Sequence, residues 1–233
     1  MDISLYCSES GAGFPLILLH GNGEDHTYFR EQALYFSKYY RVIALDTRGH
    51  GQSPRGTAPF SLTQFVADLK EFMDQKQISR AHLLGFSDGA NIALLFALNF
   101  PERVEKLILN GGNLNPRGVK LHIQLPILLG WACTRLFRHI SPQALANYEM
   151  LNLMVTQPHL SGVQLSVLTA PVLVIAGDKD MIRETHTRLI ADSLPNSRLC
   201  ILRGDHFIAA KNSREFNRAV AGFLNETSEN DGK

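Results

Sequence analysis

Apolar residues along the chain form six short runs without the alternation expected of a half-exposed strand. The runs lie at residues 16–19, 42–45, 81–85, 104–109, 171–176 and 198–202. Unalternated runs of this length are typical of strands buried on both faces, as in parallel sheets covered by helices. We therefore predict an α/β fold with a mostly parallel central sheet, to which residues 3–6 are expected to add an edge strand.

Between these runs, apolar residues recur every three or four positions, which is the period of a helix with one buried face. A helix is predicted directly after Ser61, because Ser61 and Gln64 match the capping-box pattern at a helix start. A second is predicted over residues 87–99, where Pro101 limits its extent. A third is predicted near the C-terminus, where Asn212 and Glu215 mark its start and one face carries Phe216, Val220, Phe223 and Leu224. Strands that alternate with helices in this way support the parallel sheet.

One long segment interrupts the alternation of strands and helices. Residues 113–168 contain no clear strand pattern, and they carry four prolines, at positions 116, 126, 142 and 158. Helical patches are predicted at residues 121–137 and 142–154. We interpret residues 113–168 as a helical insertion into an α/β core that is formed by residues 1–112 and 169–233.

A candidate nucleophile follows the third apolar run, in the sequence Gly85-Phe86-Ser87-Asp88-Gly89. This is a G-x-S-x-G motif between a predicted strand and a predicted helix, which is the setting that raises a serine above a sheet on a sharp turn. The start of the helix adds free amides and partial positive charge where an oxyanion would form. The alternative is that Ser87 only caps the helix, but the strand–turn–helix context favours a nucleophile.

A nucleophilic serine needs a base, and the base needs an orienting carboxylate. His206 lies just past the last apolar run, on a loop at the carboxyl end of a predicted strand. The loop after the preceding run offers two carboxylates, Asp178 and Asp180. Either choice gives the chain order Ser, Asp, His.

Five motifs in this order resemble those of the α/β-hydrolase superfamily. They are His20-Gly21-Asn22-Gly23, the turn from Asp46 to Ser53, the serine elbow at Ser87, the turn at residues 177–180 and the final His206. The resemblance covers nearly the whole chain outside the insertion. It implies the α/β-hydrolase fold, a nucleophile–acid–base triad, an oxyanion hole of backbone amides, and a helical cap formed by residues 113–168.

Matched position by position, the resemblance implies that Ser87 is the nucleophile and His206 the base. It implies Asp180 as the acid, with Asp178 as the rival. The backbone amides of Asn22 and Asp88 match the oxyanion donors. His20 matches a histidine that is usually structural, and Asp205 departs from the glycine that often precedes the base.

The substrate-binding residues are expected to come from the elbow and the cap. The cap is predicted to line an apolar acyl pocket, with Leu128 and Trp131 as candidate contacts. Asp88 is a candidate for binding a substrate amine, as in valacyclovir-hydrolase-like family members with a similar Ser-Asp-Gly elbow. The alternative is that its carboxylate caps the helix and accepts hydrogen bonds from backbone amides.

A serine at the elbow favours acyl transfer to water over the chemistry of aspartate-elbow relatives such as haloalkane dehalogenases. We therefore predict a carboxylesterase-like serine hydrolase that cleaves a small ester, thioester or lactone through an acyl-enzyme intermediate. The alternatives are a hydrolase-like small-molecule receptor with little turnover, and a carbon–carbon bond hydrolase or lyase with the same triad. The predicted partner is a small acyl substrate, and the sequence leaves the oligomeric state open.

Composition limits the other classes of partner. The 233 residues include 23 Lys and Arg against 22 Asp and Glu, so the net charge of +1 is too small for a dedicated nucleic-acid binder. It also argues against attachment to anionic membranes by charge alone. The apolar stretch at residues 125–133 is far shorter than the ~20 residues of a membrane span.

The cysteines and the remaining motifs point to a protein without bound metal or cofactor. The three cysteines are scattered, which disfavours disulfides and zinc sites and suggests a cytoplasmic location. Asp25 and His26 lack a metal-ligand pattern and are expected to belong to a loop surface. Gly11-Ala12-Gly13 lacks the strand–helix setting of a dinucleotide site.

Overall fold

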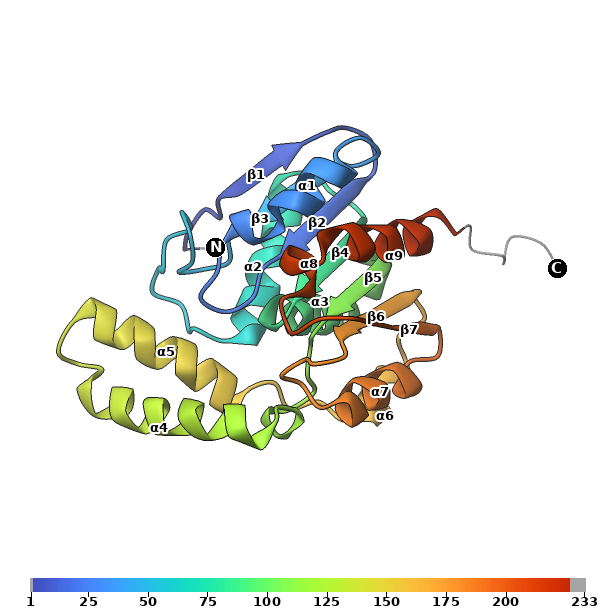
Figure 1. The fold of residues 1–233 in the computed structure, drawn as a ribbon. Coiled ribbons are helices and arrows are strands. Elements are labelled where there is room, and N and C mark those ends of the chain that lie inside the picture. The colour runs from blue at the N-terminus through green and yellow to red at the C-terminus, as the bar shows by residue number, and fades with distance from the viewer. Residues whose placement is uncertain (1, 227–233) are drawn as a thin grey trace.

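The computed structural model describes residues 2–226, which form a seven-stranded sheet between two layers of helices (Figure 1). The strands are β1 (Cys7–Ser10), β2 (Pro15–Leu19), β3 (Arg41–Leu45), β4 (Ala81–Phe86), β5 (Val104–Asn110), β6 (Val172–Gly177) and β7 (Ser197–Leu202). Their order is β1-β3-β2-β4-β5-β6-β7, and every neighbouring pair is parallel except β1 with β3. The six predicted strands and the mostly parallel sheet are thereby confirmed.

The edge strand differs from the prediction. Cys7–Ser10 pairs antiparallel with β3, whereas residues 3–6 lie outside the sheet. Tyr6 instead hydrogen bonds through its backbone to Ser53 Oγ and to the Asp46 amide. The prediction was wrong because it followed apolar side chains, while an edge strand is positioned by the unpaired backbone groups of its neighbour.

The helices cover both faces of the sheet. On one face, α2 (Leu62–Gln75), α3 (Asp88–Asn99) and α7 (Glu184–Ser193) contribute to one apolar core. On the other, α1 (Arg30–Phe36), α8 (Ile208–Lys211) and α9 (Ser213–Asn225) contribute to a second core. Short 3₁₀ turns, η1 (His26–Phe29) and η2 (Pro101–Arg103), precede α1 and follow α3.

The predicted start of α2 is present, but only half of the capping box forms. Ser61 Oγ accepts a hydrogen bond from the Gln64 amide at 3.2 Å. The Gln64 side chain does not return to Ser61, because it donates to Asp68 Oδ1 instead. Asp68 is buried and ion-paired with Arg48, so tertiary contacts decide where the glutamine points.

Residues 113–168 contain helices and no strand. They form η3 (Pro116–Gly118), α4 (Leu121–Phe137), α5 (Pro142–Thr156) and α6 (Gly162–Leu165), so the first helical patch is confirmed and the second runs two residues beyond its predicted end. Helices α4 and α5 pack as a hairpin that projects past the sheet (Figure 1). In residues 2–226, no helix combines the length and the apolar composition needed to cross a membrane.

Candidate active site

Ser87 lies on a strained turn between β4 and α3. Its backbone has φ 53° and ψ −118°, a left-handed value that is rare outside glycine. The flanking glycines make the turn sterically feasible, since a Cβ at Gly85 would lie 2.2 Å from the Gly89 carbonyl oxygen and one at Gly89 would lie 2.0 Å from the Leu19 carbonyl oxygen. The Ser87 amide donates to the Asn110 carbonyl at 2.8 Å, which ties the turn to the end of β5.

His206 and Asp180 meet at the carboxyl ends of β7 and β6. His206 Nδ1 lies 2.7 Å from Asp180 Oδ1, and both side chains are buried. Asp180 Oδ1 also accepts the Ile182 amide at 2.8 Å, which holds the carboxylate in place. Asp178 is exposed and accepts the Gly204 amide instead, so the structure brings Asp180 and not Asp178 to His206.

The ring of His206 lies beside the serine turn. Its centroid is 4.8 Å from that of Phe86, the residue directly before Ser87. Because Asp180 occupies Nδ1, Nε2 is the ring nitrogen left for the serine. The Ser87 hydroxyl has no hydrogen-bond partner among residues 2–226, which leaves it available to a base.

The backbone of the loop after β2 faces the same turn. The Asn22 amide donates to no other residue in the described part of the chain, while the Asn22 side chain donates to the Met150 carbonyl in α5 at 2.9 Å. The Asp88 amide lies at the start of α3, where no preceding helical turn offers it a carbonyl. Both amides expected to form an oxyanion hole are thus unpaired donors.

Buried His20 organises this loop. Its Nε2 accepts the Thr47 amide at 3.0 Å, and its Nδ1 lies 2.7 Å from the Gly21 carbonyl. These contacts require a neutral ring protonated at Nδ1, and burial lowers the pKa of His20 accordingly. His20 therefore joins the loop after β2 to the loop after β3.

Asp88 does not act as a helix cap. Its Oδ1 accepts the Asn91 side-chain amide at 3.1 Å, and its buried Oδ2 has no partner among residues 2–226. Burial raises the pKa of Asp88 to about 6. The expected bonds to backbone amides are absent, and the carboxylate keeps one free oxygen near Ser87.

The sequence interpretation missed Glu24, Asn91 and Asn113. Glu24 Oε2 accepts the Gly21 amide at 3.1 Å, next to the candidate oxyanion donor, and burial raises the pKa of Glu24 to about 7. Asn91 contacts Asp88 and also donates to Asn113 Oδ1 at 3.0 Å. Nothing in the local sequence marked these residues, because their burial and the contact between Asn91 and Asn113 depend on how separate segments pack.

Two cavities lie at the site. One, of about 30 Å³, is lined by Ser87 and Asp88 together with Asn113, Val119, Gln124, Ile127, Met154, Gln157, Met181 and Ile182. The other, of about 250 Å³, is lined by Asp180 and His206 together with Lys120, His122, Ile123, Lys179, Met181, Asp205 and Phe207. Met181 lines both, so the cavities lie on either side of it.

Leu128 and Trp131 line neither of these cavities. Helix α4 contributes Gln124 and Ile127 to the smaller one, whereas Trp131 donates through Nε1 to Asn152 in α5 at 3.0 Å. Seven residues of helix separate Trp131 from Gln124, which carries it about 10 Å farther along the axis. The inserted helices therefore reach the site through the first turns of α4 and the end of α5.

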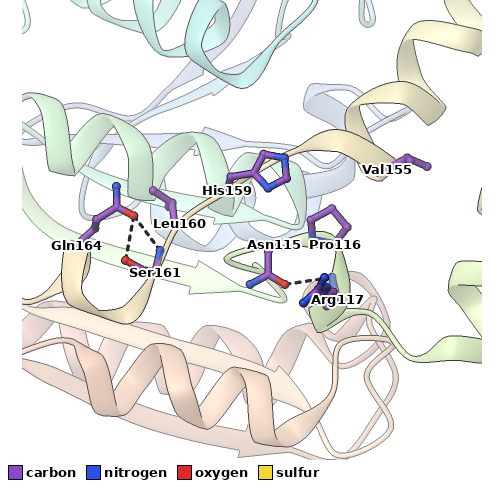
Figure 2. Close-up of a pocket in the computed structure, with 8 residues that line it drawn as sticks. All are labelled: Asn115, Pro116, Arg117, Val155, His159, Leu160, Ser161 and Gln164. Atoms are coloured by element: carbon purple, nitrogen blue, oxygen red, sulfur yellow. Dashed lines mark hydrogen bonds between the residues drawn. The ribbon is translucent and has the colours of Figure 1, made fainter.

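The largest of the described cavities lies away from this site. It measures about 610 Å³ and is lined by Asn115, Pro116, Arg117, Val155, His159, Leu160, Ser161 and Gln164, as Figure 2 shows. These residues lie in the segment before α4, at the end of α5 and in the segment that follows it through α6. Since none of Ser87, His206 and Asp180 lines it, cavity size does not locate the reactive groups.

Asp25, His26 and Asp46 bring three ligand atoms within 4.8 Å of one another. Asp46 Oδ1 already accepts both the His26 amide and ring nitrogen, and Asp46 Oδ2 accepts the Gln52 amide. Asp25 Oδ1 accepts the amide and hydroxyl of Thr27. These bonds engage the carboxylates of Asp25 and Asp46 and the ring of His26 within the loop structure.

Relatives with known names share most of the length of this chain. A 2-hydroxy-6-oxononadienedioate/2-hydroxy-6-oxononatrienedioate hydrolase from Cupriavidus pinatubonensis is 28% identical, covering 96% of this chain and 91% of the relative. Among solved structures, an enol-lactonase from Burkholderia xenovorans superposes with a TM-score of 0.81 at 21% identity, covering 96% of this chain and 97% of that one. The meta-cleavage product hydrolase from Pseudomonas fluorescens superposes with a TM-score of 0.80 at 23% identity, covering 96% and 94%.

A family model also matches the chain, and it describes a whole fold family instead of one relative. The model for the alpha/beta hydrolase fold matches residues 15–159, which is more than half of the chain. That stretch holds the loop after β2, the serine turn and both long helices of the insertion. With the sheet order and the serine turn described above, this match shows that the chain belongs to the α/β-hydrolase fold family.

Proposed function

We propose that the protein is a serine hydrolase that cleaves a small ester, thioester or lactone through an acyl-enzyme intermediate. Ser87 is the nucleophile, His206 the base and Asp180 the residue that orients His206. The observation that carries the proposal is the 2.7 Å contact between His206 and Asp180 beside a serine held in a strained turn. A buried carboxylate on Nδ1 fixes the tautomer that lets Nε2 accept a proton.

The chemistry follows from this arrangement. Ser87 Oγ bonds to the substrate carbonyl carbon while its proton passes to His206 Nε2, and Asp180 stabilises the resulting imidazolium. The negative charge on the former carbonyl oxygen faces the amides of Asn22 and Asp88. Collapse breaks the bond to the leaving group, which takes the proton from His206. Water then repeats the sequence, releasing the acid and restoring Ser87.

The two cavities suggest where each half of the substrate lies. The leaving group must reach the proton on His206, so the cavity of about 250 Å³ lined by His206 suits it. The acyl group then occupies the cavity beside Ser87. That cavity, at about 30 Å³, holds one or two waters, which favours a small acyl group such as acetyl.

The test of the proposal is covalent labelling combined with kinetics. A fluorophosphonate should label the wild type once, at Ser87 by peptide mass spectrometry. Ser87→Ala should lose the label and about 10⁵-fold in kcat on an acetyl ester, since the triad acts as a unit. Labelling at another residue, or retention of activity in Ser87→Ala with an unchanged melting temperature, would contradict the assignment.

A second candidate is cleavage of a carbon–carbon bond with the same residues. The names of the Cupriavidus and Pseudomonas relatives favour it. A meta-cleavage product and a matched acetyl ester, compared for kcat/KM under the same conditions, distinguish the two reactions. The receptor alternative predicts a rise in melting temperature with ligand but no product from either substrate.

The proposal includes a cytoplasmic location, with which the free cysteines at positions 7, 133 and 200 agree.

Asp88 is proposed to bind an amine of the substrate through its unpartnered Oδ2, since a cation would satisfy a buried carboxylate. An α-amino acyl ester should then exceed its des-amino analogue in kcat/KM for the wild type but not for Asp88→Asn. Equal ratios in the two proteins would leave Asp88 without this role.

A further inference from the structure

The outer side of α4 carries large apolar side chains that the described part of the chain leaves uncovered. They recur at helical spacing and continue into the turn before α5. Their exposed fractions are 62% for Leu121, 50% for Leu125, 69% for Leu129, 77% for Leu136, 55% for Phe137 and 74% for Ile140. No residue of α4 is fully buried, so this helix is apolar on both sides and has a neighbour on only one.

In the inserted segment, residues 113–168, cationic side chains outnumber carboxylates. Residues 113–168 contain four cationic side chains, Arg117, Lys120, Arg135 and Arg138, and one carboxylate, Glu149. Glu149 forms an ion pair with Arg55 of the core at 2.6 Å. The segment therefore carries a net charge of +3, while the whole chain carries only +1.

The positive side chains lie close to the apolar stripe. Arg135 lies over the Trp131 ring at 5.4 Å, and Arg138 lies over the Tyr148 ring at 5.1 Å. Neither guanidinium has a carboxylate partner among residues 2–226. A large exposed apolar patch marks a contact with a protein or a membrane, and exposed apolar area together with unpaired cations strengthens binding to an anionic bilayer surface.

We propose that α4 and the turn that follows it bind the surface of a bilayer containing anionic lipids. The leucine stripe enters the boundary between headgroups and acyl chains, and the arginines contact lipid phosphates. The net charge of the whole chain is only +1, because the remaining residues carry a net charge of −2 that offsets the +3 of residues 113–168. A second copy of the chain fits the stripe less well, because it would bring two segments of charge +3 together.

Docking of α4 would bring the candidate active site to the lipid surface. The stripe residues Leu121 and Leu125 share the first turns of α4 with Gln124 and Ile127, which line the cavity beside Ser87. The proposal goes beyond the serine-hydrolase chemistry and does not depend on it.

The protein contains one tryptophan, Trp131, and it lies on α4. Vesicles of phosphatidylcholine alone and with phosphatidylglycerol added can therefore be titrated while tryptophan emission is followed. We expect a blue shift with the mixed vesicles, quenching by brominated acyl chains, and co-flotation of the protein. Binding should weaken as sodium chloride is raised, since salt screens the lipid charge.

Matched variants separate the contribution of the leucines to vesicle binding from that of the arginines. Leu125→Gln with Leu129→Gln should lower the partition constant by about tenfold, because half-exposed leucines lose part of their transfer free energy. Arg135→Gln with Arg138→Gln should lower it by about fivefold for each charge removed. Leu34→Gln, at a 60% exposed site in α1, and Arg214→Gln with Arg218→Gln in α9 are the controls and should bind as the wild type does.

Two results would overturn the proposal. One is a failure of the folded wild type to bind phosphatidylglycerol vesicles at low salt, or equal binding by the α4 variants and their controls. The other is a concentration-dependent dimer in sedimentation velocity that the leucine variants abolish, without vesicle binding. That second result would assign the stripe to a contact between copies of the chain. Loss of ester hydrolysis alone would bear only on the proposed catalytic function.

Discussion

At Ser87, His206 and Asp88, burial and backbone geometry determine which polar atoms have partners and which remain free. The left-handed backbone of Ser87 leaves its hydroxyl without a hydrogen-bond partner in the described chain. The carboxylate of Asp180 meets His206 within the protein, where solvent screens their interaction little. Asp88 is also buried, and its Oδ2, like that of Asp180, has no partner among residues 2–226, but only Asp180 has an imidazole beside its other oxygen.

Asp180→Asn and Asp178→Asn are expected to have very different effects. Asp180→Asn should lower kcat by up to about 10⁴-fold, because the side-chain NH2 group of asparagine donates to His206 Nδ1 and holds the ring in the wrong tautomer. Asp178→Asn should leave kcat within a few-fold of the wild type, since its side chain contacts only the Gly204 amide. Steady-state kinetics on an acetyl ester, with melting temperatures as the folding control, check this; a larger loss from Asp178→Asn would contradict it.

The buried carboxyl group of Asp88 should make stability depend on pH. Burial raises its pKa to about 6, above the ordinary value of 3.8, so the folded state holds this proton more tightly than the unfolded state does. The associated stability is complete below pH 3.8 and lost as pH rises through about 6. Asp88→Asn, which cannot ionise, should therefore exceed the wild type in unfolding free energy by up to about 3 kcal/mol at pH 8.

Denaturant unfolding of both proteins at pH 4 and pH 8 measures this difference. The gap between variant and wild type should shrink to a small fraction at pH 4, because the carboxyl group is then protonated in the folded state and close to half protonated in the unfolded state, where its pKa is 3.8. A gap of equal size at both pH values would mean that the substitution acts through packing instead of ionisation.

At the scale of elements, the turn after β5 shows how one glycine makes room for the ring of His206. Gly111 has a φ of +64°, and a Cβ there would lie 2.7 Å from His206 Cε1 and 2.9 Å from Nδ1. The strand itself was predictable from its apolar run, but the need for glycine at its end was not. That need arises because a loop about a hundred residues later packs against it.

Gly111→Ala should therefore lower both stability and kcat, the latter because the added methyl group displaces His206. Gly222→Ala is the matched control: it lies in α9 with nothing within 4 Å of its would-be Cβ, and should stabilise the protein by about 0.5–1 kcal/mol without a change in kcat. Thermal unfolding and ester kinetics on both variants provide the measurement. Wild-type kcat in Gly111→Ala would show that His206 is not constrained from this side.

At the scale of the whole molecule, a buried ion-pair network joins three distant parts of the chain. The Arg48 guanidinium is fully buried and contacts Asp68 on α2 at 2.7 Å and Asp2 near the N-terminus at 2.6 Å. Asp2 in turn accepts the amides of Thr57 and Ala58. Arg48 therefore holds the turn after β3 against α2 and the N-terminal segment.

Arg48→Met should lower the unfolding free energy by about 3–5 kcal/mol, because it leaves the buried Asp68 carboxylate without its partner. For a chain of this size that corresponds to a fall in melting temperature of roughly 10 °C. The control is Arg41→Met, whose partly exposed pair with Glu9 should contribute less than about 1 kcal/mol. Similar losses from the two variants in calorimetry would contradict the importance of burial.

Much of the fold could be predicted because its signals are local. Runs of apolar residues located the core strands to within a residue or so at most ends, and Ser61 marked the start of α2. The G-x-S-x-G motif located the serine turn, since a Cβ at either of its glycines would clash with nearby backbone carbonyl groups. The position of β1 could not be found in this way, because it depends on the free edge of β3.

The sequence by itself determined the order of strands and helices and the turn at Ser87, because periodicity and turn sterics act over a few neighbouring residues. Tertiary structure decided which aspartate meets His206, since residues 178 and 180 both follow β6 and only the packing of two loops separates them. It also decided that Asp88 keeps a free oxygen and that the leucines of α4 face outward. Those outcomes depend on contacts between segments far apart in the chain, which no local pattern encodes.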